Sequence, residues 1–102
     1  MTITLYKPSE EPQQLAHFEG AENLISGGNR PMEHVAALMG CTPGLVDVLA
    51  SGPNYVMFSI FDYEGPINLP AMEVLTKLTG VEMNVDDEDE QLCGPILVVT
   101  LD

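Results

Sequence analysis

The side chains most able to do chemistry in this chain are carboxylates in its second half. Five of them are consecutive, Asp86–Glu90, and Asp62 and Glu64 flank a tyrosine earlier in the chain. Adjacent carboxylates repel one another and must stay hydrated, which predicts an exposed loop. The run lacks the glycine at the sixth loop position and the terminal bidentate glutamate in register that an EF-hand needs. We therefore expect no specific calcium site and no other cofactor.

Two cysteines and two histidines are the other candidate reactive groups. Cys41 or Cys93 beside His17 or His34 can make a nucleophile–base pair. Cys93 precedes an apolar strand, and His34 falls opposite the apolar stripe of its helix, so a small buried side chain and a surface histidine explain them better. No third group is placed to orient a base, and no ligand spacing indicates zinc. The sequence predicts no catalytic residues and a protein that is not an enzyme.

Net charge restricts the class of partner. The 102 residues include sixteen acidic and three basic side chains, which gives a formal net charge of −13 at pH 7. Such a chain repels phosphate backbones and anionic membranes, so direct binding to nucleic acid or to a membrane is disfavoured. Basic surfaces attract it, including those of proteins whose own ligand is DNA or RNA. The alternative is that the acidity only keeps a small protein soluble.

A concentrated negative patch is expected if the two acidic segments meet. Nine of the sixteen carboxylates lie between Asp62 and Glu90, against the single cation Lys77. If both segments project from the same end of a sheet, their combined field can mimic the phosphates of DNA or dock on a basic pocket. The predicted partner-binding residues are Asp62, Glu64, Asp86, Asp87, Glu88, Asp89 and Glu90.

Length and the N-terminal sequence set the expected class of protein. A chain of 102 residues predicts one domain, residues 1–102, with one modest core. Met1–Lys7 lacks the charged start and long apolar region of a signal peptide, and no stretch reaches the length of a membrane span. We therefore expect a cytoplasmic protein whose Cys41 and Cys93 are reduced thiols. The sequence does not indicate an oligomeric state.

The elements that must position these residues follow from apolar patterns. Two helices begin at Pro31 and Pro70, since proline suits the first helical turn, and each ends at a glycine. Four strands are predicted, at Thr2–Tyr6, Leu45–Leu49, Tyr55–Asp62 and Ile96–Leu101. This order predicts an α+β fold of the split β-α-β-β-α-β type, with two helices on one face of a four-stranded antiparallel sheet. The continuous apolar strand at the C-terminus belongs in the middle of that sheet.

Two parts of the chain have less definite patterns. Ser9–Asn29 is interrupted by proline and glycine, and we expect a surface excursion in which Ala21–Ser26 forms one helical turn. The strand from Tyr55 places Val56, Phe58 and Ile60 in the core. Its other face is too apolar for water alone, so it is either covered by the excursion or available to a partner. That face carries Tyr55, Met57, Ser59, Phe61 and Tyr63.

Four short motifs lie between Pro31 and Asp102. They are a short helix ending in glycine, a strand closed by an acidic residue and Glu-Gly, a Leu-Pro helix start, and a Gly-x-hydrophobic strand. The matching pieces are Leu38-Met39-Gly40, Phe61-Asp62-Tyr63-Glu64-Gly65, Asn68-Leu69-Pro70 and Cys93-Gly94-Pro95-Ile96-Leu97-Val98-Val99. In these motifs the chain resembles a small family of unknown function found in phages, plasmids and other mobile elements. The resemblance implies a mobile-element origin and no catalytic residues.

Three hypotheses for function remain at this point. The first is a small acidic binding protein of phage or mobile-element origin that occupies a basic site on a host protein, such as a nucleic-acid-binding site, as an inhibitor or DNA mimic. The second is a housekeeping or regulatory module whose acidity serves only solubility. The third is a small hydrolase or transferase, for which no nucleophile, base and orienting group can be named together.

Overall fold

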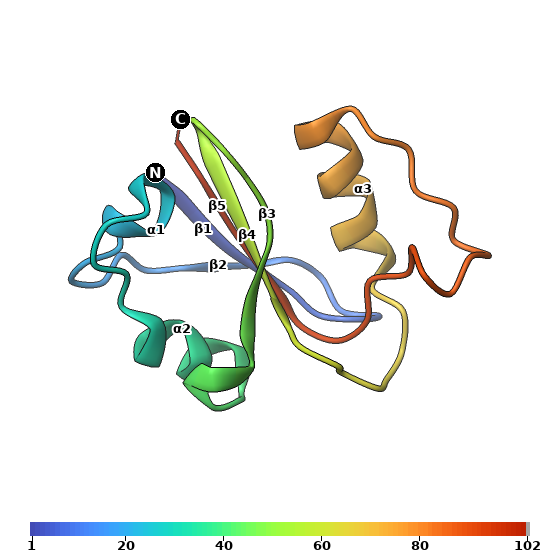
Figure 1. Cartoon of the computed structure of the whole chain (residues 1–102), viewed down its shortest axis with the longest axis horizontal. Coiled ribbons are helices and arrows are strands. Elements are labelled where there is room, and N and C mark those ends of the chain that lie inside the picture. The colour runs from blue at the N-terminus through green and yellow to red at the C-terminus, as the bar shows by residue number, and fades with distance from the viewer. Residues whose placement is uncertain (102) are drawn as a thin grey trace.

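A five-stranded antiparallel sheet forms the centre of the computed structural model, which describes residues 1–101 (Figure 1). The strand order is β2-β1-β5-β4-β3, and every neighbouring pair is antiparallel. The strands are β1 (Thr2–Tyr6), β2 (Gln13–Leu15), β3 (Val46–Gly52), β4 (Tyr55–Ile60) and β5 (Ile96–Thr100). The predicted interior position of the C-terminal strand is confirmed, because β5 pairs with β1 on one side and with β4 on the other.

Three α-helices and one 3-10 turn complete the described part of the chain. They are α1 (Asn23–Ser26), α2 (Met32–Met39), α3 (Leu69–Thr79) and the turn η1 (Pro43–Leu45). The two predicted helices correspond to α2 and α3, and Gly40 and Gly80 end them in the left-handed conformation. No helix within residues 1–101 has the length and apolar character needed to cross a membrane.

The helices cover both faces of the sheet, which corrects the prediction of two helices on one face. Leu97 and Val99 of β5 belong to a core shared with α1 and α2, whereas Ile96 and Val98 belong to a second core under α3. Figure 1 shows the sheet nearly edge-on, with α1 and α2 on one side and α3 on the other. Successive side chains of a strand point to opposite faces, and all four of these are buried, so β5 needs cover on both sides.

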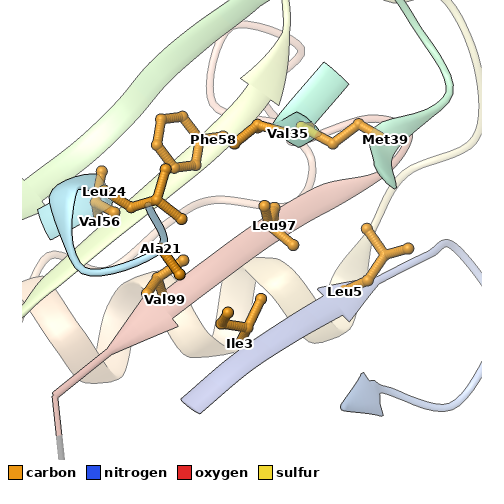
Figure 2. Packing of buried hydrophobic residues seen from close by; sticks show 10 residues of the cluster. All are labelled: Ile3, Leu5, Ala21, Leu24, Val35, Met39, Val56, Phe58, Leu97 and Val99. Carbon is orange, nitrogen blue, oxygen red and sulfur yellow. The ribbon is translucent and has the colours of Figure 1, made fainter. Parts of the chain in front are cut away.

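The first core includes part of the segment that was expected to be a surface excursion. Ala21 and Leu24 are 1% and 0% exposed, and Figure 2 shows them in one cluster with Val56 and Val99. The helical turn predicted there is present as α1, and β2 adds a fifth strand beside β1. The predicted count of four strands is therefore wrong. A strand of three residues is too short to show a hydrophobic period, so the pattern did not reveal β2.

The second face of β4 is covered by α3 and not by the N-terminal segment. Met57 is fully buried in the core that contains Ala71 and Leu75 of α3. Phe61 and Tyr63 follow the end of β4 and are 61% and 41% exposed. Of this predicted face, the large apolar side chains that stay exposed are thus in the turn after β4 and not on the strand itself.

Candidate functional site

Two loops meet at one end of the sheet. One is the β4–α3 turn, residues 61–68, which begins with Asp62 at a φ of +53°, a left-handed conformation that aspartate tolerates better than most residues. The other is the α3–β5 loop, residues 80–95, which contains the acidic run. Ile67 and Cys93 form an isolated antiparallel bridge between them. The bridge places the turn that carries Asp62 beside the end of the acidic run.

Asn68 stabilises the junction of the two loops through buried hydrogen bonds. Its side chain is fully buried, and its Nδ2 donates hydrogen bonds to the carbonyl oxygens of Tyr6 at 2.9 Å and Gly94 at 2.8 Å. Its Oδ1 accepts from the backbone N–H of Ala71 at 3.2 Å, which caps α3, and its own backbone N–H donates to the carbonyl of Leu92 at 2.7 Å. Sequence reasoning missed this role, although an asparagine just before a Leu-Pro helix start is a capping signal.

An acidic groove of about 420 Å³ opens between the two loops. Its carboxylates come from both, with Asp62 from the turn and Glu88, Asp89 and Glu90 from the acidic run. Apolar side chains also line it: Leu49 of β3, Ile96 of β5 and Met83 of the α3–β5 loop. The other predicted binding residues, Glu64, Asp86 and Asp87, lie exposed on the same two loops but do not line the groove. The structure therefore brings together four of the seven predicted residues.

The acidic run is ordered by its own hydrogen bonds. The backbone N–H of Asn84 donates to Oε2 of Glu90 at 2.9 Å, and the backbone N–H of Asp89 donates to Oδ1 of Asp87 at 2.9 Å. Gln91 closes the loop by donating from Nε2 to the carbonyl of Val85 at 2.8 Å. Asp87 and Glu90 thus maintain the shape of the loop as well as contributing charge.

Tyr63 is a groove residue that sequence reasoning assigned only to a strand face. Its ring packs on two glycines, because a Cβ at Gly65 would lie 2.5 Å from Cε1 of the ring and a Cβ at Gly94 would lie 2.5 Å from both Cδ1 and Cε1. These glycines come from the two loops, so the ring bridges them while Tyr63 stays 41% exposed. An aromatic face beside carboxylates is a favourable environment for a lysine or arginine side chain.

Cys93 is separated from the candidate base His34. Cys93 lines the acidic groove, whereas His34 is exposed on α2, beyond the opposite face of the sheet, and stacks on Phe18 with ring centroids 3.9 Å apart. Both cysteines are free thiols, and burial raises the pKa of the Cys41 thiol, which disfavours the reactive thiolate. Across residues 1–101, no group of three or more His, Cys, Asp and Glu side chains is arranged to hold a metal ion.

Comparisons with protein-family models, with curated proteins and with solved structures found no match to this chain. The resemblance of residues 31–102 to a family from mobile elements stays a prediction. Function is therefore inferred from the geometry and charge of the molecule itself.

Proposed function

We propose that this protein is a small, non-enzymatic binding protein that occupies a basic site on a partner protein through its acidic groove. One observation supports this most directly: Asp62 and the segment Glu88–Glu90, far apart in the sequence, line the same groove. The net charge of −13 extends the attraction beyond the contact surface. Complementary fields of this kind raise the rate of association and disfavour acidic competitors.

The groove suits a lysine or arginine side chain in particular. The carboxylates of Asp62 and Asp89 can accept charge-assisted hydrogen bonds from an ammonium or guanidinium group. The apolar wall formed by Leu49 and Met83 can contact the aliphatic stem of the same side chain. The exposed ring of Tyr63 adds a surface on which a guanidinium can stack.

The partner we propose is a host protein whose basic site normally binds DNA or RNA. A loop that is hydrogen-bonded internally holds several carboxylates apart in a fixed arrangement, as a nucleic-acid backbone holds its phosphates. An inhibitor or DNA mimic encoded by a phage or plasmid would act in this way in the bacterial cytoplasm. A second candidate function, acidity for solubility alone, is favoured by Glu64 and Asp86, which are exposed outside the groove.

Affinity capture from a bacterial lysate tests this proposal. The groove variant carries three isosteric changes that remove charge from the groove: Asp62→Asn, Glu88→Gln and Asp89→Asn. The control variant removes the same number of charges at exposed N-terminal positions: Glu10→Gln, Glu11→Gln and Glu22→Gln. We expect the parent and the control variant to retain the same basic protein at low salt and to lose it at high salt, because exposed charges are screened within about 10 Å at 0.1 M.

The groove variant should not capture that protein while remaining folded by circular dichroism. If it retains the partner as well as the parent does, the acidic groove is not the binding surface. Equal loss of binding in the groove and control variants would favour general acidity over a defined site.

A further inference from the structure

A second, apolar groove lies on α3, and the acidic loop forms its other wall. Its volume is about 160 Å³, and it is lined by Leu69, Met72, Glu73, Thr76, Met83 and Val85. Leu69 and Val85 are 52% and 44% exposed. Met83 lines this groove and the acidic groove as well, so the two grooves are adjacent across one loop.

The size of the apolar groove matches one side chain. An apolar cavity of about 150 Å³ holds a benzene molecule, so about 160 Å³ takes one aromatic or branched aliphatic group. Filling it would remove the exposed surfaces of Leu69 and Val85 from water, which is the main favourable contribution at the centre of an interface.

The charge around the apolar groove determines which kind of polypeptide can place a side chain in it. Glu73 lines the apolar groove and Asp86 directly follows Val85, while the only basic side chain between Asp62 and Glu90 in the sequence is Lys77. A second copy of this protein would carry the same charge of −13 and would be repelled. A segment with lysine or arginine next to its apolar residue would be attracted.

We propose that the apolar groove binds one aromatic or branched aliphatic side chain from a basic segment of the partner, while lysine or arginine residues of the same segment occupy the acidic groove. This inference rests on the proposed function and adds the chemistry of the recognised segment. The loop that contains Met83 then lies between the anchor residue and the cationic residues.

Synthetic peptides test the anchor directly. The probes are arginine-containing peptides in which a single leucine is moved stepwise along the chain, each paired with its leucine-to-alanine counterpart. At one position of the leucine, we expect the leucine peptide to bind the parent at least roughly tenfold more tightly than the alanine peptide, because it buries a whole aliphatic side chain.

Two variants of the protein locate the anchor. Leu69→Ser with Val85→Ser should abolish the advantage of the leucine peptide, and both positions are exposed, so the fold should persist. The matched control is Leu45→Ser with Val48→Ser, and it should retain the advantage. Leu45 lies in η1 and Val48 in the edge strand β3, and both are of comparable exposure. A leucine advantage that survives in the first variant would overturn the inference.

The peptides also separate this inference from the proposed function. If they bind the parent with strong salt dependence but leucine adds nothing at any position, the anchor is wrong and the acidic groove remains the binding surface. If no arginine-containing peptide binds the parent even at low salt, the proposed function fails together with the inference.

Discussion

The side chain of Asn68 donates a hydrogen bond to the backbone carbonyl of Tyr6 at 2.9 Å, across 62 positions of sequence. The same nitrogen reaches the carbonyl of Gly94 at 2.8 Å. One fully buried amide thus joins the end of β1, the start of α3 and the approach to β5. Both loops that form the acidic groove begin or end at this junction, so an uncharged residue controls the geometry of a charged surface.

Replacing Asn68 should be costly. Asn68→Ala should lower the free energy of unfolding by about 2–4 kcal/mol, because it removes the N-cap acceptor and deprives two carbonyls of their donor. Asn68→Asp keeps the acceptor but loses the donor and buries a charge, so it should destabilise at least as much. Urea denaturation followed by circular dichroism measures both changes. An Asn68→Asp variant as stable as the parent would show that the Nδ2 hydrogen bonds contribute little.

The positions of the main elements could be predicted because their signals are local. Pro70 and Gly80 mark α3, and the apolar run in β5 marks a buried strand. The arrangement of the helices was predicted wrongly, although the four consecutive apolar residues Ile96–Val99 indicate a strand that is buried on both faces. A strand that is apolar on both faces requires cover on both faces, and a sheet with both helices on one side leaves its other face in water.

Only the charged residues of the candidate site could be predicted from the sequence. The clustering of carboxylates along the sequence identified Asp62 and the acidic run, and the fold places part of that set in one groove. The roles of Tyr63 and Asn68 depend on contacts between residues 61–68 and residues 92–94. Such contacts form between segments far apart in the sequence, so no local pattern reports them. The polar segment Gln13–Leu15 was missed for the same reason, since it is a strand only through pairing with β1.

Two leucines of α3 should respond very differently to the same substitution. Leu75 is 9% exposed in the core under α3, so Leu75→Ala should cost about 2–4 kcal/mol through lost burial and a residual cavity. Leu69 is 52% exposed, so Leu69→Ala should change stability by no more than about 0.5 kcal/mol. Denaturation midpoints compare the two directly. Equal midpoints would mean that the buried face of α3 has been assigned incorrectly.

Two glycine substitutions can separate the stability cost of a clash with the Tyr63 ring from the cost of backbone strain. Gly65→Ala and Gly94→Ala each place a Cβ against the ring, but Gly94 also has a φ of +74°. A left-handed alanine costs about 1–2 kcal/mol, so Gly94→Ala should be the more destabilising change.

A Tyr63→Ala background tests that separation by double-mutant cycles. Without the ring, Gly65→Ala should become nearly neutral, whereas Gly94→Ala should keep its backbone cost. Chemical denaturation of the three single and two double variants measures the coupling. If the cost of Gly65→Ala is unchanged when the ring is absent, the ring does not pack on that glycine in solution.

The Cys41 thiol should ionise at higher pH than a free cysteine, because burial raises its pKa above the ordinary value of 9.0. The neutral thiol is favoured in the folded state, so the resulting stabilisation is fully present below the unfolded pKa and is lost as the pH rises through the folded pKa. A Cys93→Ser variant isolates Cys41 for alkylation by iodoacetamide. Its rate should increase at higher pH than that of a short cysteine peptide. If the alkylation rate of Cys41 rises at the same pH as that of the peptide, or at a lower pH, the result would contradict the burial of this thiol.

Added salt should stabilise the parent protein. A net charge of −13 destabilises a compact state by self-repulsion, and the screening length falls from about 10 Å at 0.1 M to about 3 Å at 1 M. The groove variant with Asp62→Asn, Glu88→Gln and Asp89→Asn loses three negative charges, which changes the net charge from −13 to −10. Its Tm at low salt should equal or exceed that of the parent, and its rise with sodium chloride should be smaller.

The variant with Glu10→Gln, Glu11→Gln and Glu22→Gln has the same net charge of −10 and separates local from overall repulsion. Because Asp62, Glu88 and Asp89 share one groove, neutralising them should reduce the salt dependence of Tm more than neutralising the N-terminal residues. Differential scanning calorimetry over a range of salt concentrations measures this difference. If the groove variant melts below the parent at every salt concentration, the groove carboxylates stabilise the fold and do not repel one another, and a binding role would no longer be needed to explain why they are gathered there.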